Sequence, residues 1–402
     1  MAGVQGLCPA FKGVWGIFYK KSLKAISPLL QRSPHAQNFP ILALTLPAKT
    51  STMVSSIFNM QSLSFDKVSQ FLKERHEPDF RVKQWQQAFF KGKCLKFEDL
   101  TMFSEALRTD LIQNFGERLH PVEPLTVQCD EQASKYLLKM EDDARVECVY
   151  MKFREGIKSL CISTQVGCPC ACAFCATGGI GFKRNLTLDE ILGQVLYVNK
   201  TTEGVDRITV MGMGEALLNP NIFEALRCLI DPHMFGLSPH RISMSTVGNI
   251  EGIREMTRRF PQITLTFSFH FPEQSLREQW MPTAKKYALK DVFEALDEHV
   301  RTTKKKVYLA YMVIDGINNR PQDIAHLRQW IQERGDLAYL YHVNLIPFHP
   351  IPGLAVPETP RALAIKLQKE LERYGIEATV RQSFGKSIKG ACGQLAAGYK
   401  KK

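Results

Sequence analysis

Four cysteines lie within eight residues near the middle of the chain: Cys168, Cys170, Cys172 and Cys175. Cys168, Cys172 and Cys175 form a C-x3-C-x2-C triplet on a glycine-containing segment. Three thiolates on a short loop can bind three irons of a 4Fe–4S cluster, which leaves the fourth iron open to a small molecule. The alternatives are a zinc knuckle and structural thiols, because C-x2-C pairs are common. A zinc site needs a second ligand pair nearby, and no cysteine follows before Cys228. The triplet therefore favours a catalytic cluster.

The remaining composition is typical of a protein with a large core in a reducing compartment. With 402 residues the chain is long enough for two or three domains. Its other cysteines are isolated from one another, which is unlike the paired framework of a small secreted scaffold. No apolar run approaches the ~18 residues that a membrane span needs. We therefore expect no membrane partner.

The net charge of +12 favours a polyanionic partner such as nucleic acid. Half of this charge lies in the first 65 residues, which contain six Lys or Arg and no Asp or Glu. Residues 1–60 are therefore interpreted as a basic extension. They are either an organelle transit peptide or the result of an over-extended gene start, with Met53 or Met60 as the true initiator. We expect a cytoplasmic protein, or an organellar one if the extension is a transit peptide.

Residues 64–118 are predicted to form a small helical domain. The apolar residues of 65–72 share one helical face, and Ser64 is a candidate N-cap. Two further helices are expected at about 80–92 and 104–115. The aromatic residues of this region are interpreted as core and not as stacking platforms for nucleic-acid bases.

Beyond residue 125 the pattern predicts strands that alternate with helices. Strands are expected at 146–151, 159–164, 206–213, 241–246, 263–270, 305–314 and 341–348. Helices are expected near 188–199, 221–230, 251–259, 290–303, 321–334 and 360–373. Six successive β/α pairs imply a parallel sheet covered by helices on its outer side, with too few strands for a full eight-stranded barrel. The predicted fold is α/β, a partial (βα)6 barrel, with ligands at the C-terminal ends of its strands.

Glycines and polar side chains mark the ends of three further strands. Gly212–Glu215 ends one strand, where glycines allow close approach of a ligand and the carboxylate can bind an ammonium group. Ser245 ends the next strand, and Ser268 and His270 end the one after it. Together with the cysteine loop, four successive strand ends point to one pocket.

These motifs, in this order, resemble the RlmN/Cfr family of radical S-adenosylmethionine (SAM) enzymes, which methylate adenosine in RNA. Besides the cysteine loop, the matching segments are VECVYM, CISTQVGC, GFKRNLT, MGMGE, MSTVGN, the SFH run, MPTAKKY, YMVIDGIN, HVNLIPF and KGACGQLA. They run in order over about residues 64–398. The resemblance implies a radical SAM barrel over 125–398 and an RNA-binding accessory domain at 64–118.

The resemblance also assigns roles at matching positions. Cys168, Cys172 and Cys175 are similar to the family's cluster ligands. The residues at SAM-binding positions are Gly214, Glu215, Ser245, Ser268, Phe269 and His270. The residues at catalytic positions are Cys392, which carries the methyl group on a C-terminal loop, Cys161, its resolving partner, and Glu147, a proton acceptor.

In the reaction that the resemblance implies, two SAM molecules are used per turnover. One methylates the thiolate of Cys392. The second binds the open iron and is cleaved to a 5′-deoxyadenosyl radical, which takes a hydrogen from the Cys392 methyl group. The resulting methylene radical adds to the adenine ring. Proton loss and attack by Cys161 then release methylated RNA and leave a Cys161–Cys392 disulfide.

The implied substrate is ribosomal RNA, with transfer RNA as a further candidate and carbon 2 of adenine favoured over carbon 8. The implied electron donor is a flavodoxin or ferredoxin, and we expect a monomer. Basic residues that are candidates for phosphate contacts are Lys183, Arg184, Lys285, Lys286, Lys304 to Lys306, Arg381, Lys386, Lys389 and Lys400 to Lys402.

Two positions depart from the family pattern. Ala216 stands where the family usually has a proline, and His349 stands where it has an asparagine that contacts SAM. A histidine can still donate a hydrogen bond, so we expect His349 to contact SAM. Two rival functions are a radical SAM enzyme with another substrate and a catalytically inactive RNA-binding relative. The presence of both Cys161 and Cys392 argues against each rival.

Overall fold

The computed structural model describes residues 63–399. The predictions for the extension 1–60 and for Lys400 to Lys402 therefore lie outside the described residues. No helix within 63–399 combines the length and the apolar character needed to cross a membrane.

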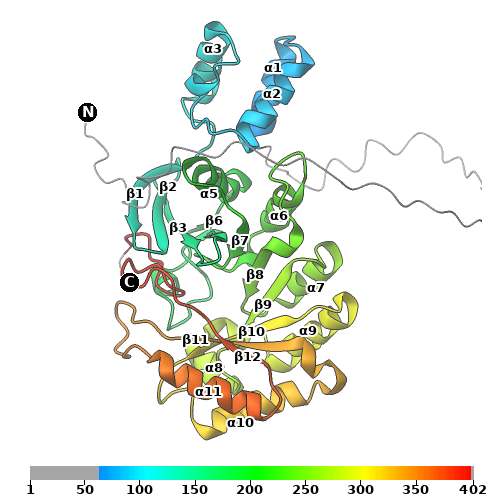
Figure 1. The fold of residues 1–402 in the computed structure, drawn as a ribbon, viewed down its shortest axis with the longest axis vertical. Helices are drawn as coiled ribbons and strands as arrows, with labels where there is room; N and C mark the ends of the chain where they lie inside the picture. The colour runs from blue at the N-terminus through cyan, green and yellow to red at the C-terminus, as the bar shows by residue number, and fades with distance from the viewer. Residues whose placement is uncertain (1–62, 400–402) are drawn as a thin grey trace, which may run out of the picture. The chain divides into compact units, whose positions relative to one another are not determined.

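Ten strands form one sheet in the order β1-β2-β3-β4-β7-β8-β9-β10-β11-β12 (Figure 1). Seven of them pair in parallel, as the predicted alternation of strands and helices requires. These are β4 (Lys158–Cys161), β7 (Arg207–Val210), β8 (Ile242–Thr246), β9 (Thr264–Ser268), β10 (Val307–Val313), β11 (Tyr341–Pro347) and β12 (Ala378–Val380). All the predicted parallel strands are present, and β12 is an addition that the sequence pattern did not predict.

Three antiparallel strands extend the sheet on the side of β4. They are β1 (Glu123–Cys129), β2 (Ala133–Lys139) and β3 (Arg145–Lys152). Only β3 was predicted as a strand of its own. β1 is the edge strand and is exposed on both faces, so its sequence lacks the alternation of a half-buried strand. A separate two-stranded sheet pairs β5 (Gln165–Val166) with β6 (Arg184–Asn185).

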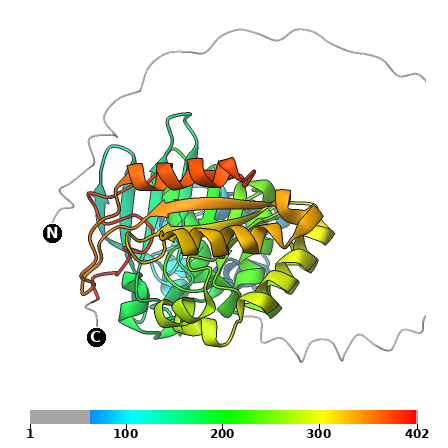
Figure 2. The ribbon, with the colours of Figure 1, turned by 90° about the horizontal axis from the view of Figure 1, so that it is seen from below.

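A helix follows each of the first six parallel strands, so the predicted partial (βα)6 barrel is confirmed. The helices are α5 (Leu188–Thr201), α6 (Ile222–Ile230), α7 (Ile250–Arg259), α9 (Leu289–Thr303), α10 (Pro321–Gln332) and α11 (Arg361–Arg373). Helix α11 packs against β11 and β12 (Figure 2). Two short helices that the sequence pattern did not predict are α4 (Ala176–Ile180) and α8 (Gln274–Trp280). Both lie in the loops at the strand ends that carry the candidate site.

The N-terminal helices form around an aromatic core, as predicted. They are α1 (Ser64–Glu74), α2 (Asp79–Phe90) and α3 (Glu105–Phe115). The rings of Phe65, Trp85 and Phe97 stack, with centroids 6.1 and 5.7 Å apart, and the Trp85 indole N–H donates to the Phe65 carbonyl oxygen. The prediction that Ser64 caps α1 is wrong, because Ser64 is the first helical residue and Leu63 is the N-cap. The Ser64 hydroxyl donates to Asp189 of α5 instead, at 2.8 Å.

A buried lysine connects the helical region to the barrel. Lys200 of α5 is 6% exposed, and its Nζ donates to the carbonyl oxygens of Ala88 at 2.7 Å and Gly92 at 3.0 Å. Ala88 lies in the last turn of α2 and Gly92 lies two residues beyond its end, where no further turn provides N–H partners. The division into a helical domain at 64–118 and a core at 125–398 stays a prediction.

Replacing Lys200 with methionine tests this connection. Methionine keeps an apolar chain but removes the donors, so two carbonyl groups lose a buried partner. We expect the free energy of unfolding to fall by about 1–3 kcal/mol, measured by chemical denaturation. The matched control is Lys93→Met, because Lys93 makes similar bonds to the carbonyls of Asn199 and Thr202 but is exposed. Its loss should stay within about 0.5 kcal/mol, and equal losses would contradict the role given to burial.

Candidate active site at the C-terminal ends of the parallel strands

The cysteine loop connects β5, the short strand that follows β4 in the chain, to α4. It closes on itself tightly: Gly167 has φ +76°, and a Cβ there would lie 1.7 Å from the carbonyl oxygen of Gly181. A glycine is therefore required where the two ends of the loop meet. The loop is also bonded to a residue outside it, because the Ala173 N–H donates to the carbonyl oxygen of Trp280 at 2.9 Å. The loop is thus held by its own backbone and by the segment after β9.

Three of the four loop cysteines are half-buried, whereas the fourth is enclosed. Cys168, Cys172 and Cys175 are intermediate in exposure, and Cys170 is 1% exposed in an apolar cluster with Phe174. Burial raises the pKa of the Cys172 and Cys175 thiols, and a hydrogen bond with Cys170 raises that of Cys168. The thiols are therefore protonated at neutral pH, and binding of iron has to displace their protons.

The number and kind of donors on the loop bear on what it can bind. A 4Fe–4S cluster takes one thiolate per iron, and three half-buried thiols lie on this loop. Within residues 63–399, no three His, Cys, Asp or Glu side chains form a site for one metal ion. The donor set therefore fits a 4Fe–4S cluster with one open iron, and its assignment to Cys168, Cys172 and Cys175 stays a prediction.

Glu215 provides an unpaired carboxylate oxygen beside this loop. The residue follows β7, is 4% exposed, and accepts a hydrogen bond through Oε2 from the Val247 N–H at 2.9 Å. Its Oε1 is buried and has no hydrogen-bond partner among the described residues. Burial raises the pKa of this carboxyl to about 7, and its charge in turn raises the pKa of Cys172. An ammonium group such as that of SAM would supply the missing partner, so the residue fits its predicted role.

Gly214 precedes Glu215 and is required by packing. It has φ +103°, and a Cβ there would lie 2.7 Å from the Cβ of Gln165. The Gln165 side chain accepts a hydrogen bond from the Glu215 N–H at 2.9 Å. The absence of a side chain at Gly214 therefore lets β5 reach and orient the residue that carries the free carboxylate.

The ends of β8 and β9 bring three more predicted residues to this region. Ser245 and Ser268 are half-buried on neighbouring parallel strands. Phe269 is fully buried, and its ring packs with aromatic rings of the barrel core. The contacts of these residues with SAM stay predictions.

His270 connects β9 to β10 and touches the cysteine loop. Its Nδ1 accepts a hydrogen bond from the Met312 N–H at 3.0 Å, and its ring lies edge-to-face with Phe174 at 5.0 Å. Burial, assisted by the charge of Arg277, lowers the pKa of His270 to about 3, so the imidazole is neutral. Its φ of 49° is unusual for a residue with a side chain, and such backbone conformations concentrate at functional sites.

The C-terminal segment after β12 packs directly on the cysteine loop. The Ala176 N–H, at the start of α4, donates to the Gly393 carbonyl oxygen at 2.7 Å. The Thr177 hydroxyl donates to the Leu395 carbonyl oxygen, also at 2.7 Å. Because α4 begins immediately after Cys175, these bonds place Cys392 next to the candidate cluster ligands.

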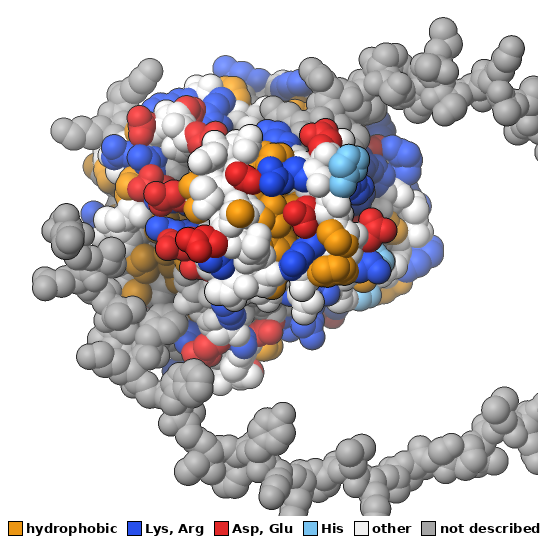
Figure 3. Space-filling model, turned by 90° about the horizontal axis from the view of Figure 1, so that it is seen from above, with side chains coloured by type: hydrophobic (Ala, Val, Ile, Leu, Met, Phe, Trp, Pro, Cys, Tyr) orange, Lys and Arg blue, Asp and Glu red, His pale blue; other side chains and the backbone are white. Residues whose placement is uncertain are grey.

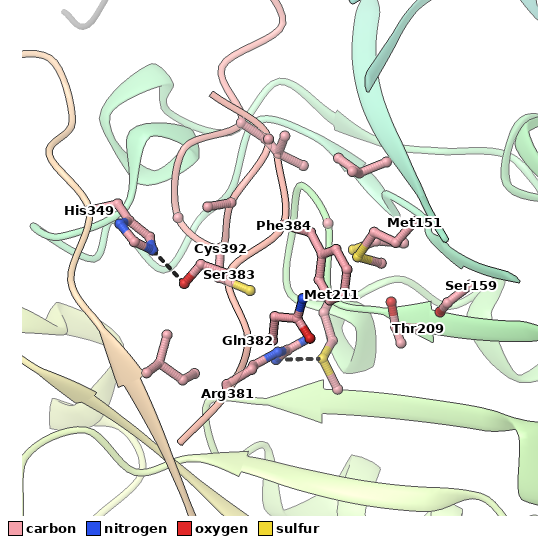
Figure 4. A pocket seen from close by; sticks show the side chains of 18 of the residues that line it. Met151, Ser159, Thr209, Met211, His349, Arg381, Gln382, Ser383, Phe384 and Cys392 are labelled. Carbon is pink, nitrogen blue, oxygen red and sulfur yellow. Dashed lines mark hydrogen bonds between the residues drawn. The ribbon is translucent and has the colours of Figure 1, made fainter. Parts of the chain in front are cut away.

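Cys161 and Cys392 line one cavity, although they are far apart in the sequence. The cavity has a volume of about 190 Å³, and Cys175 also lines it. Figure 4 shows Cys392 near Met211 and Phe384, which line the same space. Burial, assisted by the nearby Cys392, raises the pKa of Cys161 to about 11. The structure therefore brings both predicted thiols together with one predicted cluster ligand.

Glu147 does not line this cavity but holds the segment that carries Cys392. Its Oε2 accepts hydrogen bonds from the N–H groups of Ala396 at 2.8 Å and Ala397 at 3.0 Å. Its Oε1 pairs with Lys135 Nζ at 3.1 Å, and both side chains are buried. The structure thus gives Glu147 an anchoring role that the sequence did not indicate, and its role as a proton acceptor stays a prediction.

His349 lines the same cavity as the two thiols, and Figure 4 shows its bond to Ser383. Both of its ring nitrogens are engaged. Nε2 lies 2.8 Å from the Ser383 hydroxyl and Nδ1 lies 3.2 Å from a carboxylate oxygen of Glu358. Burial lowers the pKa of His349. A direct contact with SAM, which stays a prediction, would require His349 to exchange one of these two partners.

The sequence reasoning missed several residues of the site. Lys135, Met211 and Phe384 gave no signal, because a single lysine or apolar residue on a strand or loop looks like ordinary surface or core. Arg381 was predicted to contact phosphate, yet it lines the cavity, with a nitrogen 3.6 Å from the sulfur of Met211 (Figure 4). Only the assembled barrel shows which of these side chains face the thiols.

The predicted phosphate contacts are only partly free for RNA. Arg184 pairs with Asp142 and Glu190, and Lys386 pairs with Glu358. The surface in Figure 3, viewed from above relative to Figure 1, shows basic side chains interspersed with acidic ones. The described side chains that are visible on this face therefore form no continuous basic stripe.

Known proteins are similar to this chain in both sequence and fold. The profile of the Radical SAM superfamily matches residues 162–328. The chain is 41% identical over 343 residues to the ribosomal RNA large subunit methyltransferase Cfr of Bacillus velezensis, which covers 85% of this chain and 98% of that protein. It is 42% identical over 339 residues to the protein of the same name from Staphylococcus aureus, which covers 83% and 97%. A crystal structure of a radical SAM methyltransferase from Sphaerobacter thermophilus matches with a TM-score of 0.77 at 30% identity, covering 83% of this chain and 98% of that one.

The matching relatives are aligned over nearly their whole length. The resemblance deduced from the motifs is therefore confirmed: the chain belongs to the RlmN/Cfr family of radical SAM methyltransferases.

Proposed function

We propose that this chain methylates a ring carbon of adenosine in ribosomal RNA through a methyl group carried on Cys392. The names of its relatives, which are ribosomal RNA methyltransferases at about 40% identity, support the substrate class. Carbon 2 is favoured over carbon 8, and transfer RNA is a further candidate substrate. A radical SAM enzyme with another substrate and an inactive RNA-binding relative are the alternatives.

One observation supports this function above the alternatives: Cys161 and Cys392 share a cavity with Cys175. A radical SAM enzyme that does not carry its methyl group on a thiol has no need for two cysteines beside its cluster. An inactive relative would have no reason to keep them together in one cavity. A thiol that receives a methyl group and a second thiol that releases the product explain the pair.

The residues that would hold the cofactors are the cysteine triplet and the strand ends. Cys168, Cys172 and Cys175 would bind the 4Fe–4S cluster, and the free Oε1 of Glu215 would accept a hydrogen bond from the ammonium group of SAM. When bound, the cluster and SAM supply the one-electron chemistry that activates a methyl group. The neutral His270 and the apolar residues around the loop exclude water from this space.

The protein's own groups handle the protons. Cys161, with its pKa raised by burial, is protonated at neutral pH and has to lose its proton before it can attack the sulfur of Cys392. That attack would form the disulfide and break the bond between the Cys392 sulfur and the carbon attached to adenosine. Glu147 is proposed to accept a proton in the same reaction. Because its carboxylate is bonded to Lys135 and to two N–H groups of the C-terminal segment, proton transfer to Glu147 requires that one of these partners moves away.

The remaining proposals concern partners. A flavodoxin or ferredoxin would reduce the cluster, and the helical region at 64–118 would contact RNA. The protein would act as a cytoplasmic monomer, or in an organelle if residues 1–60 are a transit peptide.

The cluster ligands can be tested by loading the protein with iron under anaerobic conditions. We expect about four irons and four sulfides per chain. Cys168→Ala, Cys172→Ala and Cys175→Ala should each lose the cluster, because each removes the ligand of one iron. Cys170→Ala is the matched control from the same loop and should keep it. A cluster that survives Cys168→Ala but not Cys170→Ala would show that the ligand set is wrong.

The two thiols can be separated by their products in cells. Without Cys161 the bond between Cys392 and the adenosine cannot be cleaved, so Cys161→Ala should accumulate a covalent protein–RNA adduct. Without Cys392 no methyl group is loaded, so Cys392→Ala should form neither adduct nor methyladenosine. The measurements are a denaturing gel with and without RNase, and mass spectrometry of digested ribosomal RNA against 2-methyl- and 8-methyladenosine standards. An RNase-sensitive band in Cys392→Ala, or normal product from Cys161→Ala, would contradict these roles.

The third prediction concerns the contact of His349 with SAM. His349→Asn restores the family residue and should keep SAM affinity within about tenfold, which is about 1.4 kcal/mol. His349→Leu should weaken binding further, because it leaves a polar partner unpaired. Ser383→Ala is the control, since it removes only the bond between His349 and the C-terminal segment. If Ser383→Ala weakens binding as much as His349→Leu, then His349 acts through that segment and does not contact SAM.

A further inference from the structure

Arg277 is a buried cation that the proposed reaction does not yet use. It lies on α8 and is 0% exposed. Among residues 63–399 no carboxylate lies within ion-pair distance of it, unlike Arg334, the other largely buried arginine with an unpaired Nε. Burial lowers the pKa of Arg277 to about 10, so the guanidinium is still charged at neutral pH. A buried charge without a counter-charge is costly, which calls for an explanation.

The guanidinium is fixed by the ends of β8 and β9. Nη2 donates to the Val247 carbonyl oxygen at 2.8 Å, and Nη1 donates to the carbonyl oxygens of Ser268, at 2.8 Å, and Phe269. The guanidinium carbon lies 4.9 Å from the centre of the Phe267 ring. Three carbonyl groups and an aromatic face therefore hold the charge in one place, but none of them neutralises it.

The backbone of Val247 connects Arg277 to the proposed SAM site. Its carbonyl oxygen accepts from Arg277, while its N–H donates to Glu215 Oε2 at 2.9 Å. The N–H and the carbonyl group of one residue thus hold the Glu215 carboxylate and the guanidinium in place. This arrangement places Arg277 at the same strand ends as the cysteine loop.

Helix α8, which carries Arg277, also contacts the cysteine loop, because the carbonyl oxygen of Trp280 accepts a hydrogen bond from the Ala173 N–H at 2.9 Å. A cluster bound by Cys168, Cys172 and Cys175 would therefore place its negative charge beside this helix. The apolar residues around the loop, such as Phe174 and Phe271, would not screen the interaction between the two charges.

We propose that Arg277 is a positioning residue whose fixed positive charge balances the 4Fe–4S cluster and favours its reduced state. The inference rests on the proposed cluster at Cys168, Cys172 and Cys175. Reduction adds one negative charge to a largely apolar site, and cluster potentials depend on net charge and surroundings. A cation that is already held by backbone carbonyls stabilises that added charge without rearrangement.

The test compares the midpoint potential of the cluster in wild type, Arg277→Lys and Arg277→Gln, followed by electron paramagnetic resonance during a redox titration. Arg277→Gln removes the charge, so the ratio of reduced to oxidised cluster at a fixed potential should fall at least tenfold. For a one-electron couple this is a shift of about 59 mV to more negative potential. Arg277→Lys keeps the charge and should shift the ratio by less than threefold. Iron content, measured first, shows that each variant is loaded.

The matched control is Arg334→Gln. Arg334 is also largely buried, its guanidinium lies over the Phe293 ring at 5.2 Å, and it pairs with Asp297. It precedes β11, at the opposite end of the strands from the cysteine loop. Arg334→Gln should therefore leave the ratio of reduced to oxidised cluster, at the same fixed potential, within threefold of the wild-type ratio.

The outcomes distinguish this inference from the proposed function. An unchanged potential in Arg277→Gln, or equal shifts in the Lys and Gln variants, would overturn the role of the charge while the cluster assignment stands. If Arg277→Gln does not retain the cluster, Arg277→Lys decides: a loaded cluster near the wild-type potential supports the inference, and loss of the cluster there too overturns it. A wild-type protein that binds no cluster would instead refute the proposed function.

Discussion

The hydrogen bond from the Ala176 N–H to the Gly393 carbonyl oxygen, 2.7 Å long, is the contact on which the candidate site depends. Ala176 is the first residue of α4, and the N–H groups of a first helical turn have no partner within the helix. The C-terminal segment supplies that partner, and the Thr177 hydroxyl adds a second bond to Leu395. A helix start directly after the last loop cysteine thus binds the loop that carries Cys392. Without these two contacts, the proposed cluster ligands and the proposed methyl-carrying thiol would belong to segments that are not bonded to each other here.

Low polarity is the second constraint on the site. Burial raises the pKa of Glu215 and Cys161 and lowers the pKa of His270 and Arg277, so each of these groups is shifted toward its neutral form. Charged cofactors would therefore interact strongly with the few groups that stay charged. Glu215 and Arg277 are both bonded to the backbone of Val247, which places an unpaired carboxylate oxygen and an unpaired cation at the same strand ends.

The anchoring of the C-terminal segment limits how the proposed chemistry can proceed. Glu147 binds it at Ala396 and Ala397, and His349 binds it at Ser383. These contacts keep Cys392 near Cys161, as the proposed release step requires. The same contacts oppose any movement of Cys392 between methyl loading and attack on RNA. Glu147 would then have two functions that compete, since accepting a proton weakens a carboxylate as a hydrogen-bond acceptor for the segment.

The sequence by itself determined the order of strands and helices in the barrel and the grouping of the cysteine triplet, because periodicity and short spacing are local properties. The motifs also placed Glu215, His270 and Cys392 in a family whose fold the structure confirms. The edge strand β1 escaped prediction because both of its faces are exposed. Only the tertiary structure decided that Arg277 is buried without a counter-charge and that Glu147 holds N–H groups 249 and 250 residues away. Such contacts depend on which distant segments meet, and the spacing of residues along the chain carries no record of that.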